Sequence, residues 1–166
     1  MLKKTACIIM MMLATAVNAK PNTNSSKCTV VNGINKCHLS KSGDITINDP
    51  GHDDPKKISF VLRDHKMSGD LILYHDHVYD DEHYKDVVKG EFVIHNQSPE
   101  KNYIHYQLVL KGKKGLIAKT TGDMLVQAGN DQRIRTSNVP LARKDIAHIT
   151  SYEIKCVSSN VKLHRY

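Results

Sequence analysis

The sequence is organised around residues 71–84, which read Leu-Ile-Leu-Tyr-His-Asp-His-Val-Tyr-Asp-Asp-Glu-His-Tyr. The stretch begins with the aliphatic and aromatic types typical of a β-strand and ends in imidazoles and carboxylates. Because side chains alternate along an extended strand, four of them would share one face: Leu71, Leu73, His75 and His77. The leucines would cover a core and the histidines would lie towards the end of the sheet. We therefore expect a half-buried strand that leads into a polar rim.

The same alternation recurs elsewhere in the chain. Apolar and polar residues alternate over 57–63, 103–110 and 151–157, and turns that contain glycine, proline or asparagine separate these segments. Beyond residue 19, no long run follows the 3.6-residue period of a helix. About ten short strands at this spacing favour an all-β domain, either an antiparallel β-sandwich of immunoglobulin-like or jelly-roll-like type or a small barrel.

Two segments of the C-terminal half lead to more local expectations. Residues 116–120 and 124–127 are interpreted as two strands joined by a turn at Thr121-Gly122. Residues 139–145 are expected to contain one helical turn, with Asn138 as its cap and Pro140 near its start.

The N-terminal residues predict export. Lys3 and Lys4 precede an apolar run over 6–17, and the run ends in Val17-Asn18-Ala19, whose small residues are typical of a cleavage site. An apolar run of about 12 residues is too short to span a bilayer as a helix. No later stretch is apolar enough to cross a membrane, so the mature protein would be periplasmic or secreted.

These patterns divide the chain into four segments. They are a signal peptide over 1–19, a disordered polar leader over 20–27, a single β domain over 28–158 and a polar tail over 159–166. Removal of the signal peptide takes away two lysines and leaves a formal net charge of +5 instead of +7. Residues 20–99 carry more acidic than basic side chains and seven of the ten histidines, whereas residues 100–166 are strongly basic.

Three cysteines remain after cleavage, and export implies an oxidising compartment in which a disulfide forms. Asn32-Gly33 has the residues that a two-residue type I′ turn needs, and a hairpin there places Cys28 opposite Cys37. The two Cα atoms of such a pair lie close enough for a disulfide. The alternative joins Cys28 or Cys37 to Cys156 and ties the two ends of the domain together.

The rim of the central stretch is the candidate metal site. His75 and His77 lie two residues apart on the expected strand, so both imidazoles can point the same way. Asp81 and His83 lie within reach if the chain turns after Val78. Imidazole and carboxylate groups suit Zn²⁺ or Cu²⁺, so we predict a Zn or Cu site built from His75, His77, His83 and Asp81. The spacing matches no established metal motif; the same residues fit a pH-sensitive rim or an ordinary solvated surface.

The basic half offers a second candidate site, for anions. Its cations fall into two groups in the sequence, and the predicted anion-binding residues are Lys111, Lys113, Lys114, Arg133, Arg135, Arg143 and Lys144. If these side chains converge, they would attract phosphates or sulfates on lipids or glycans. The alternative is a solvated surface that keeps the protein soluble. Exported proteins rarely meet nucleic acid, so nucleic acid is not the expected partner.

Catalysis is the least supported class. The chain has no Gly-x-Ser-x-Gly elbow and no glycine-rich phosphate loop, and its paired carboxylates are adjacent residues that would face opposite ways on a strand. We therefore predict an exported, non-enzymatic binding module whose His- and Asp-rich rim binds Zn or Cu. The alternative function is a secreted adhesin or virulence-type factor that binds an anionic lipid, a glycan, a host surface or another protein through its basic half.

Overall fold

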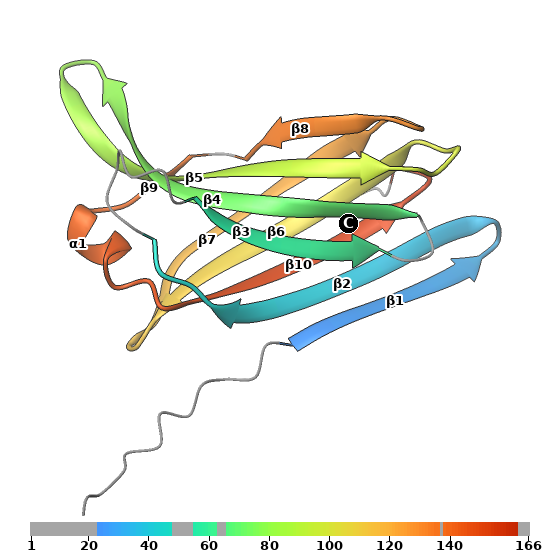
Figure 1. Ribbon diagram of the computed structural model, residues 1–166, viewed down its shortest axis with the longest axis horizontal. Coiled ribbons are helices and arrows are strands. Elements are labelled where there is room, and N and C mark those ends of the chain that lie inside the picture. The colour runs from blue at the N-terminus through green and yellow to red at the C-terminus, as the bar shows by residue number, and fades with distance from the viewer. Residues whose placement is uncertain (1–22, 48–54, 63–65, 137, 163–166) are drawn as a thin grey trace, which may run out of the picture.

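The computed structural model describes residues 23–47, 55–62, 66–136 and 138–162. Its strands form two sheets, and all the pairings are antiparallel. In the first sheet the order is β1 (Thr23–Val31), β2 (Ile34–Asp44), β10 (Ser151–Ser159), β6 (Asn102–Gly112) and β7 (Gly115–Val126). In the second sheet the order is β3 (Lys56–Leu62), β4 (Met67–Asp80), β5 (His83–Asn96) and β8 (Asp131–Arg135), and β9 (Val139–Pro140) pairs with β5. The predicted all-β sandwich is confirmed (Figure 1).

The core lies between the two sheets and follows from the alternation in the sequence. On β3, the side chains of Ile58, Phe60 and Leu62 are buried while their neighbours are not. Phe92 of β5 is fully buried and lies with its ring centroid 4.9 Å from that of Tyr106 on β6, so an aromatic pair joins the two sheets. Such contacts add to the area burial that stabilises the sandwich.

The first hairpin forms as the sequence predicts. Asn32 and Gly33 have φ angles of 52° and 75°, the left-handed values that a type I′ turn requires. Cys28 lies opposite Cys37, and the two form the predicted disulfide. The third cysteine, Cys156, is buried in the core, where desolvation raises its thiol pKa to about 12. The alternative pairings with Cys156 are therefore excluded.

The ends of the domain differ in part from the expectation. Strand β1 begins at Thr23, so the strand takes in residues that the sequence assigns to the leader. Strand β10 ends at Ser159, one residue after the predicted end of the domain. The predicted signal peptide and residues 163–166 of the predicted tail lie outside the described residues. No helix within the described residues is long and apolar enough to cross a membrane.

Of the two local expectations for the C-terminal half, the two-strand interpretation is wrong, whereas the helical turn forms but with a different cap and without Pro140. Residues 116–126 belong to one continuous strand, because β7 pairs with β6 through Gly122, which lies opposite Tyr106. A Cβ at Gly122 would lie 2.6 Å from that ring, so the glycine makes room for an aromatic neighbour and does not mark a turn. The short helix α1 (Arg143–Ile146) begins after Ala142, its N-cap residue, and Pro140 belongs to β9 instead.

Strands β4 and β5 form the longest pairing of the described residues. Each has 14 residues, and the register runs from Met67 opposite Asn96 to Asp80 opposite His83. Asp81, with a φ of 50°, begins the turn that joins them. Figure 1 shows this green and yellow-green hairpin running past the end of its sheet and curling away from the sandwich. The hairpin therefore carries side chains from the core out into solvent.

Candidate functional site

The candidate site lies where the β4–β5 hairpin leaves the core. Leu71 and Leu73 are buried, and His75 comes next on the same face of β4 with a side chain only 1% exposed. His77 follows two residues later and its side chain is 42% exposed. In the pairing of the two strands, Asp86 of β5 lies directly opposite His77. The alternation of one strand and the register of the next thus place two imidazoles and one carboxylate together.

Both imidazole rings lie close to the same carboxylate oxygen of Asp86. Asp86 Oδ1 lies 2.8 Å from His75 Nε2 and 3.2 Å from His77 Nδ1. The two imidazole ring centroids are 5.7 Å apart, and one ligand atom from each of the three residues lies within 4.8 Å of the others. A tetrahedral Zn²⁺ ion with bonds of about 2.0–2.1 Å separates its ligand atoms by about 3.3 Å. The three side chains are therefore close enough together that they could hold a metal ion once their ligand atoms adjust to this spacing.

The backbone around Asp86 is held on both sides. Its carbonyl oxygen accepts a hydrogen bond of 3.2 Å from the amide of Leu141. The next two residues of β5, Val87 and Val88, are buried and pair with β9. Because β4 pairs with β5 from the other side, the carboxylate is carried by a backbone with partners at both edges, which limits how far it can move.

Two tyrosines continue the same face towards the tip of the hairpin. Tyr79 and Tyr84 lie opposite each other with ring centroids 5.1 Å apart, and Tyr84 is 6.4 Å from the ring of His77. Both rings are largely exposed, at 63% and 75%. They give His77 aromatic neighbours on its solvent side, so the triad lies between the core and an exposed aromatic pair.

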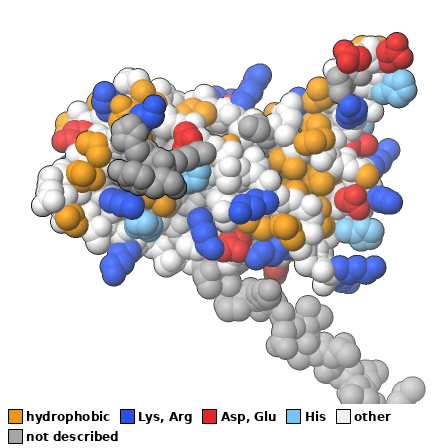
Figure 2. Space-filling view, turned by 180° about the vertical axis from the view of Figure 1, so that it is seen from behind, with side chains coloured by type: hydrophobic (Ala, Val, Ile, Leu, Met, Phe, Trp, Pro, Cys, Tyr) orange, Lys and Arg blue, Asp and Glu red, His pale blue; other side chains and the backbone are white. Residues whose placement is uncertain are grey.

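The structure corrects the predicted ligand set. His75 and His77 are brought together, but the third member is Asp86, and neither Asp81 nor His83 belongs to the cluster. Asp81 lies in the turn at the tip, and His83 pairs with the backbone of Asp80. Figure 2 shows acidic and histidine side chains gathered at this projecting end. A hairpin that turns at residues 81–82 places Asp86 opposite His77, so the turn would have identified Asp86 as a ligand. The sequence does not predict this turn, because an Asp-Glu pair is a weak turn signal.

The predicted anion-binding residues do not form one patch. Lys113 and Lys114 in the turn after β6 and Lys144 of α1 line one cavity, and Arg143 lies in the same helix. Arg133 and Arg135 lie on β8, in the other sheet.

Two of these cations are already paired within the described residues. Lys111 Nζ lies 2.7 Å from Glu153 Oε2, and Arg133 lies 3.8 Å from Glu91. Their charges are therefore partly balanced before any anion arrives, which leaves Lys113, Lys114 and Lys144 as the predicted cations that gather in one place.

Comparison of the sequence with models of known protein families finds no match, and a search of curated proteins finds none either.

The ion cluster around Glu153 makes stability depend on pH. Hydrogen bonds from Lys111 and then Lys155 lower the pKa of Glu153 from 4.5 to about 2. A carboxyl whose pKa is lower in the folded state stabilises the fold fully above its unfolded pKa, and this contribution is lost as the pH falls towards the folded value. We expect Glu153→Gln to lower the free energy of unfolding by about 1 kcal/mol at neutral pH, because solvent screens a surface pair.

Denaturant unfolding at a series of pH values measures this difference. The gap between wild type and Glu153→Gln should narrow as the pH falls from about 4.5 towards about 2. Glu100→Gln is the control, because Glu100 is exposed and its carboxylate forms no ion pair within the described residues. A gap that stays constant with pH, or an equal effect of the control substitution, would contradict the assignment.

Proposed function

We propose that the protein is an exported, non-enzymatic module that binds one Zn²⁺ or Cu²⁺ ion through His75, His77 and Asp86. The observation that carries the proposal is the convergence of two imidazole nitrogens on one carboxylate oxygen, at 2.8 and 3.2 Å. Two nitrogen donors and one oxygen donor are a set that both ions accept. Three protein ligands leave a fourth position for water or for a donor from a partner.

The surroundings of the triad support binding. The His75 side chain is almost fully buried, and the backbone of Asp86 has hydrogen-bonded partners. Both features limit movement of these ligands, so these side chains lose little conformational freedom when an ion binds. Metal binding would replace protons that the rings now share with the carboxylate, so affinity should fall in acid. Export is supported by the apolar N-terminal segment and by the Cys28–Cys37 disulfide, since such bonds persist in oxidising compartments.

Calorimetric titration of the purified protein with Zn²⁺ and Cu²⁺ tests the proposal. We expect saturation near one equivalent, and we expect His77→Ala and Asp86→Asn each to weaken binding by at least about tenfold, because each removes one of three ligands. These two positions are preferred to His75, whose truncation would leave a cavity beneath the site.

Two histidine variants are the matched controls. His105→Ala removes a half-exposed strand histidine that lies 2.8 Å from its own carboxylate, Asp123, and His83→Ala removes the histidine nearest the tip. Neither should change the affinity. Unaltered binding by the His77 variant, or a loss in His83→Ala as large as the loss in His77→Ala, would contradict the proposed ligand set.

A second function, binding to an anionic membrane surface, is supported by a different part of the surface. Lys113, Lys114 and Lys144 line a cavity of about 800 Å³, and Leu116 beside them is 67% exposed. An apolar side chain flanked by lysines suits a membrane interface, where the chain enters the headgroup layer and the cations meet lipid phosphates. We propose this surface as the site of the alternative function.

Vesicle co-sedimentation tests the second function. Binding to vesicles that contain phosphatidylserine should weaken steeply with added salt, and Lys113→Gln with Lys114→Gln should weaken it by more than about tenfold, at about 1 kcal/mol per lysine. Lys119→Gln with Lys162→Gln removes the same charge from exposed positions away from the cavity. An equal loss in this control would show that net charge alone is responsible, and a flat salt response would exclude the mechanism.

A further inference from the structure

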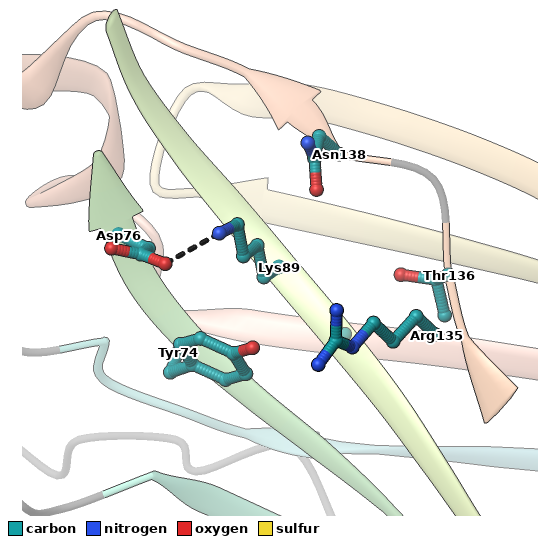
Figure 3. A pocket seen from close by; sticks show the side chains of 7 residues that line it. Tyr74, Asp76, Lys89, Arg135, Thr136 and Asn138 are labelled. Atoms are coloured by element: carbon teal, nitrogen blue, oxygen red, sulfur yellow. Dashed lines mark hydrogen bonds and ion pairs between the residues drawn. The ribbon is translucent and has the colours of Figure 1, made fainter. Parts of the chain in front are cut away.

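A polar pocket opens on the outer face of the second sheet. It has a volume of about 400 Å³ and is lined by Tyr74, Asp76, Lys89, Gly90, Arg135, Thr136 and Asn138. These residues come from β4, from β5 and from the segment that begins at the end of β8. Figure 3 shows the side chains of Lys89 and Arg135 on the same side of β5, with the guanidinium directed towards the hydroxyl of Tyr74.

The pocket is separate from the metal triad although both use β4. Tyr74 and Asp76 alternate with His75 and His77, so their side chains project from the opposite face of the strand. Lys89 lies opposite Tyr74 in the pairing with β5 and belongs to this outer face as well. A ligand in the pocket would therefore not touch the metal ligands, and the inference does not depend on the metal.

The two cations of the pocket differ in what they already contact. Lys89 Nζ lies 2.5 Å from Asp76 Oδ2, and a hydrogen bond from this lysine lowers the pKa of the carboxyl. Arg135 pairs with Glu91 in the register of the strands, but the carboxylate of Glu91 lies 3.8 Å from Arg133. Arg135 has no ion-pair partner within the described residues. The charges of Asp76, Lys89 and Arg135 sum to one positive charge. Because Lys89 is paired with Asp76, this net charge lies on the guanidinium of Arg135.

The polar groups around Arg135 are held in position. The amide of Thr136 donates a 2.8 Å hydrogen bond to the carbonyl of Gly90. A Cβ at Gly90 would lie 2.7 Å from Oγ1 of Thr136, so the glycine leaves room for this threonine. Asn138 adds an amide and Tyr74 adds a ring with a hydroxyl at its edge.

We propose that this pocket binds a sugar acid, a hydroxylated ring that carries a single carboxylate. The guanidinium of Arg135 has the fork geometry that binds a carboxylate through two parallel hydrogen bonds. One net positive charge matches one carboxylate, whereas a phosphate dianion would leave a charge unbalanced. Thr136, Asn138 and the hydroxyl of Tyr74 supply donors and acceptors for ring hydroxyls, and the ring of Tyr74 supplies the flat apolar wall common in small-molecule sites.

Titration of the full chain with glucuronate, followed by amide chemical shifts, tests the proposal. Glucose serves as the neutral match, acetate as the carboxylate without a ring, and inorganic phosphate as the competing anion. We expect glucuronate to bind in the millimolar range and more tightly than each of the other three, with shifts centred on Tyr74, Gly90 and Thr136. Preference for phosphate, or shifts centred on another face, would overturn the assignment.

Neighbouring arginines of β8 provide a matched pair of variants. Arg135→Ala should weaken glucuronate binding by at least about tenfold, because it removes a charge-assisted bidentate contact. Arg133→Ala removes the same charge from the same face of the strand and should change the affinity by less than about twofold. Both positions are exposed, so both variants should fold, and an amide spectrum close to that of the wild type checks this. Equal losses in the two variants would overturn the role of Arg135 and leave only a general charge effect.

Discussion

Strands β4 and β5 pair without interruption over their whole length, and this one register determines what the hairpin presents on each face. Because side chains alternate, a slip of one residue would move every buried side chain of one strand to the opposite face. The buried leucines of β4 and the fully buried Phe92 of β5 make such a slip costly. The hydrophobic core therefore fixes, several residues away, that His77 lies opposite Asp86.

Burial of a histidine at the edge of this core also needs explanation. A buried imidazole costs free energy unless its polar atoms have partners, and Asp86 provides one for His75 at 2.8 Å. The same carboxylate oxygen lies near His77 at 3.2 Å. A purely structural role would need only the first of these contacts. The second contact comes from His77, whose side chain is 42% exposed. It places a solvent-accessible imidazole beside the buried His75 and Asp86, so the three residues together could hold an ion.

Much of the fold follows from the sequence, because strand alternation and turn chemistry are local. Asn32-Gly33 predicts a turn and, through it, the Cys28–Cys37 disulfide. The turn predicted at Gly122 is absent, because a glycine opposite an aromatic ring on the next strand has the same sequence signal as a turn.

The sequence predicts only part of the candidate site, because one of its residues lies on a different strand from the other two. Two histidines on one strand are visible in the sequence, whereas Asp86 enters through pairing with another strand and Asp81 is carried away by the turn. The basic residues divide between the region of the β6–β7 turn and α1 and strand β8 of the other sheet, which their spacing in the sequence could not show.

The most direct test of the central claim is anomalous diffraction at the zinc absorption edge from crystals grown with Zn²⁺. We expect one strong peak, about 2.0–2.1 Å from His75 Nε2, His77 Nδ1 and a carboxylate oxygen of Asp86. A peak at the hairpin tip between Asp81 and His83, or an empty triad in crystals that bind zinc elsewhere, would contradict the central claim.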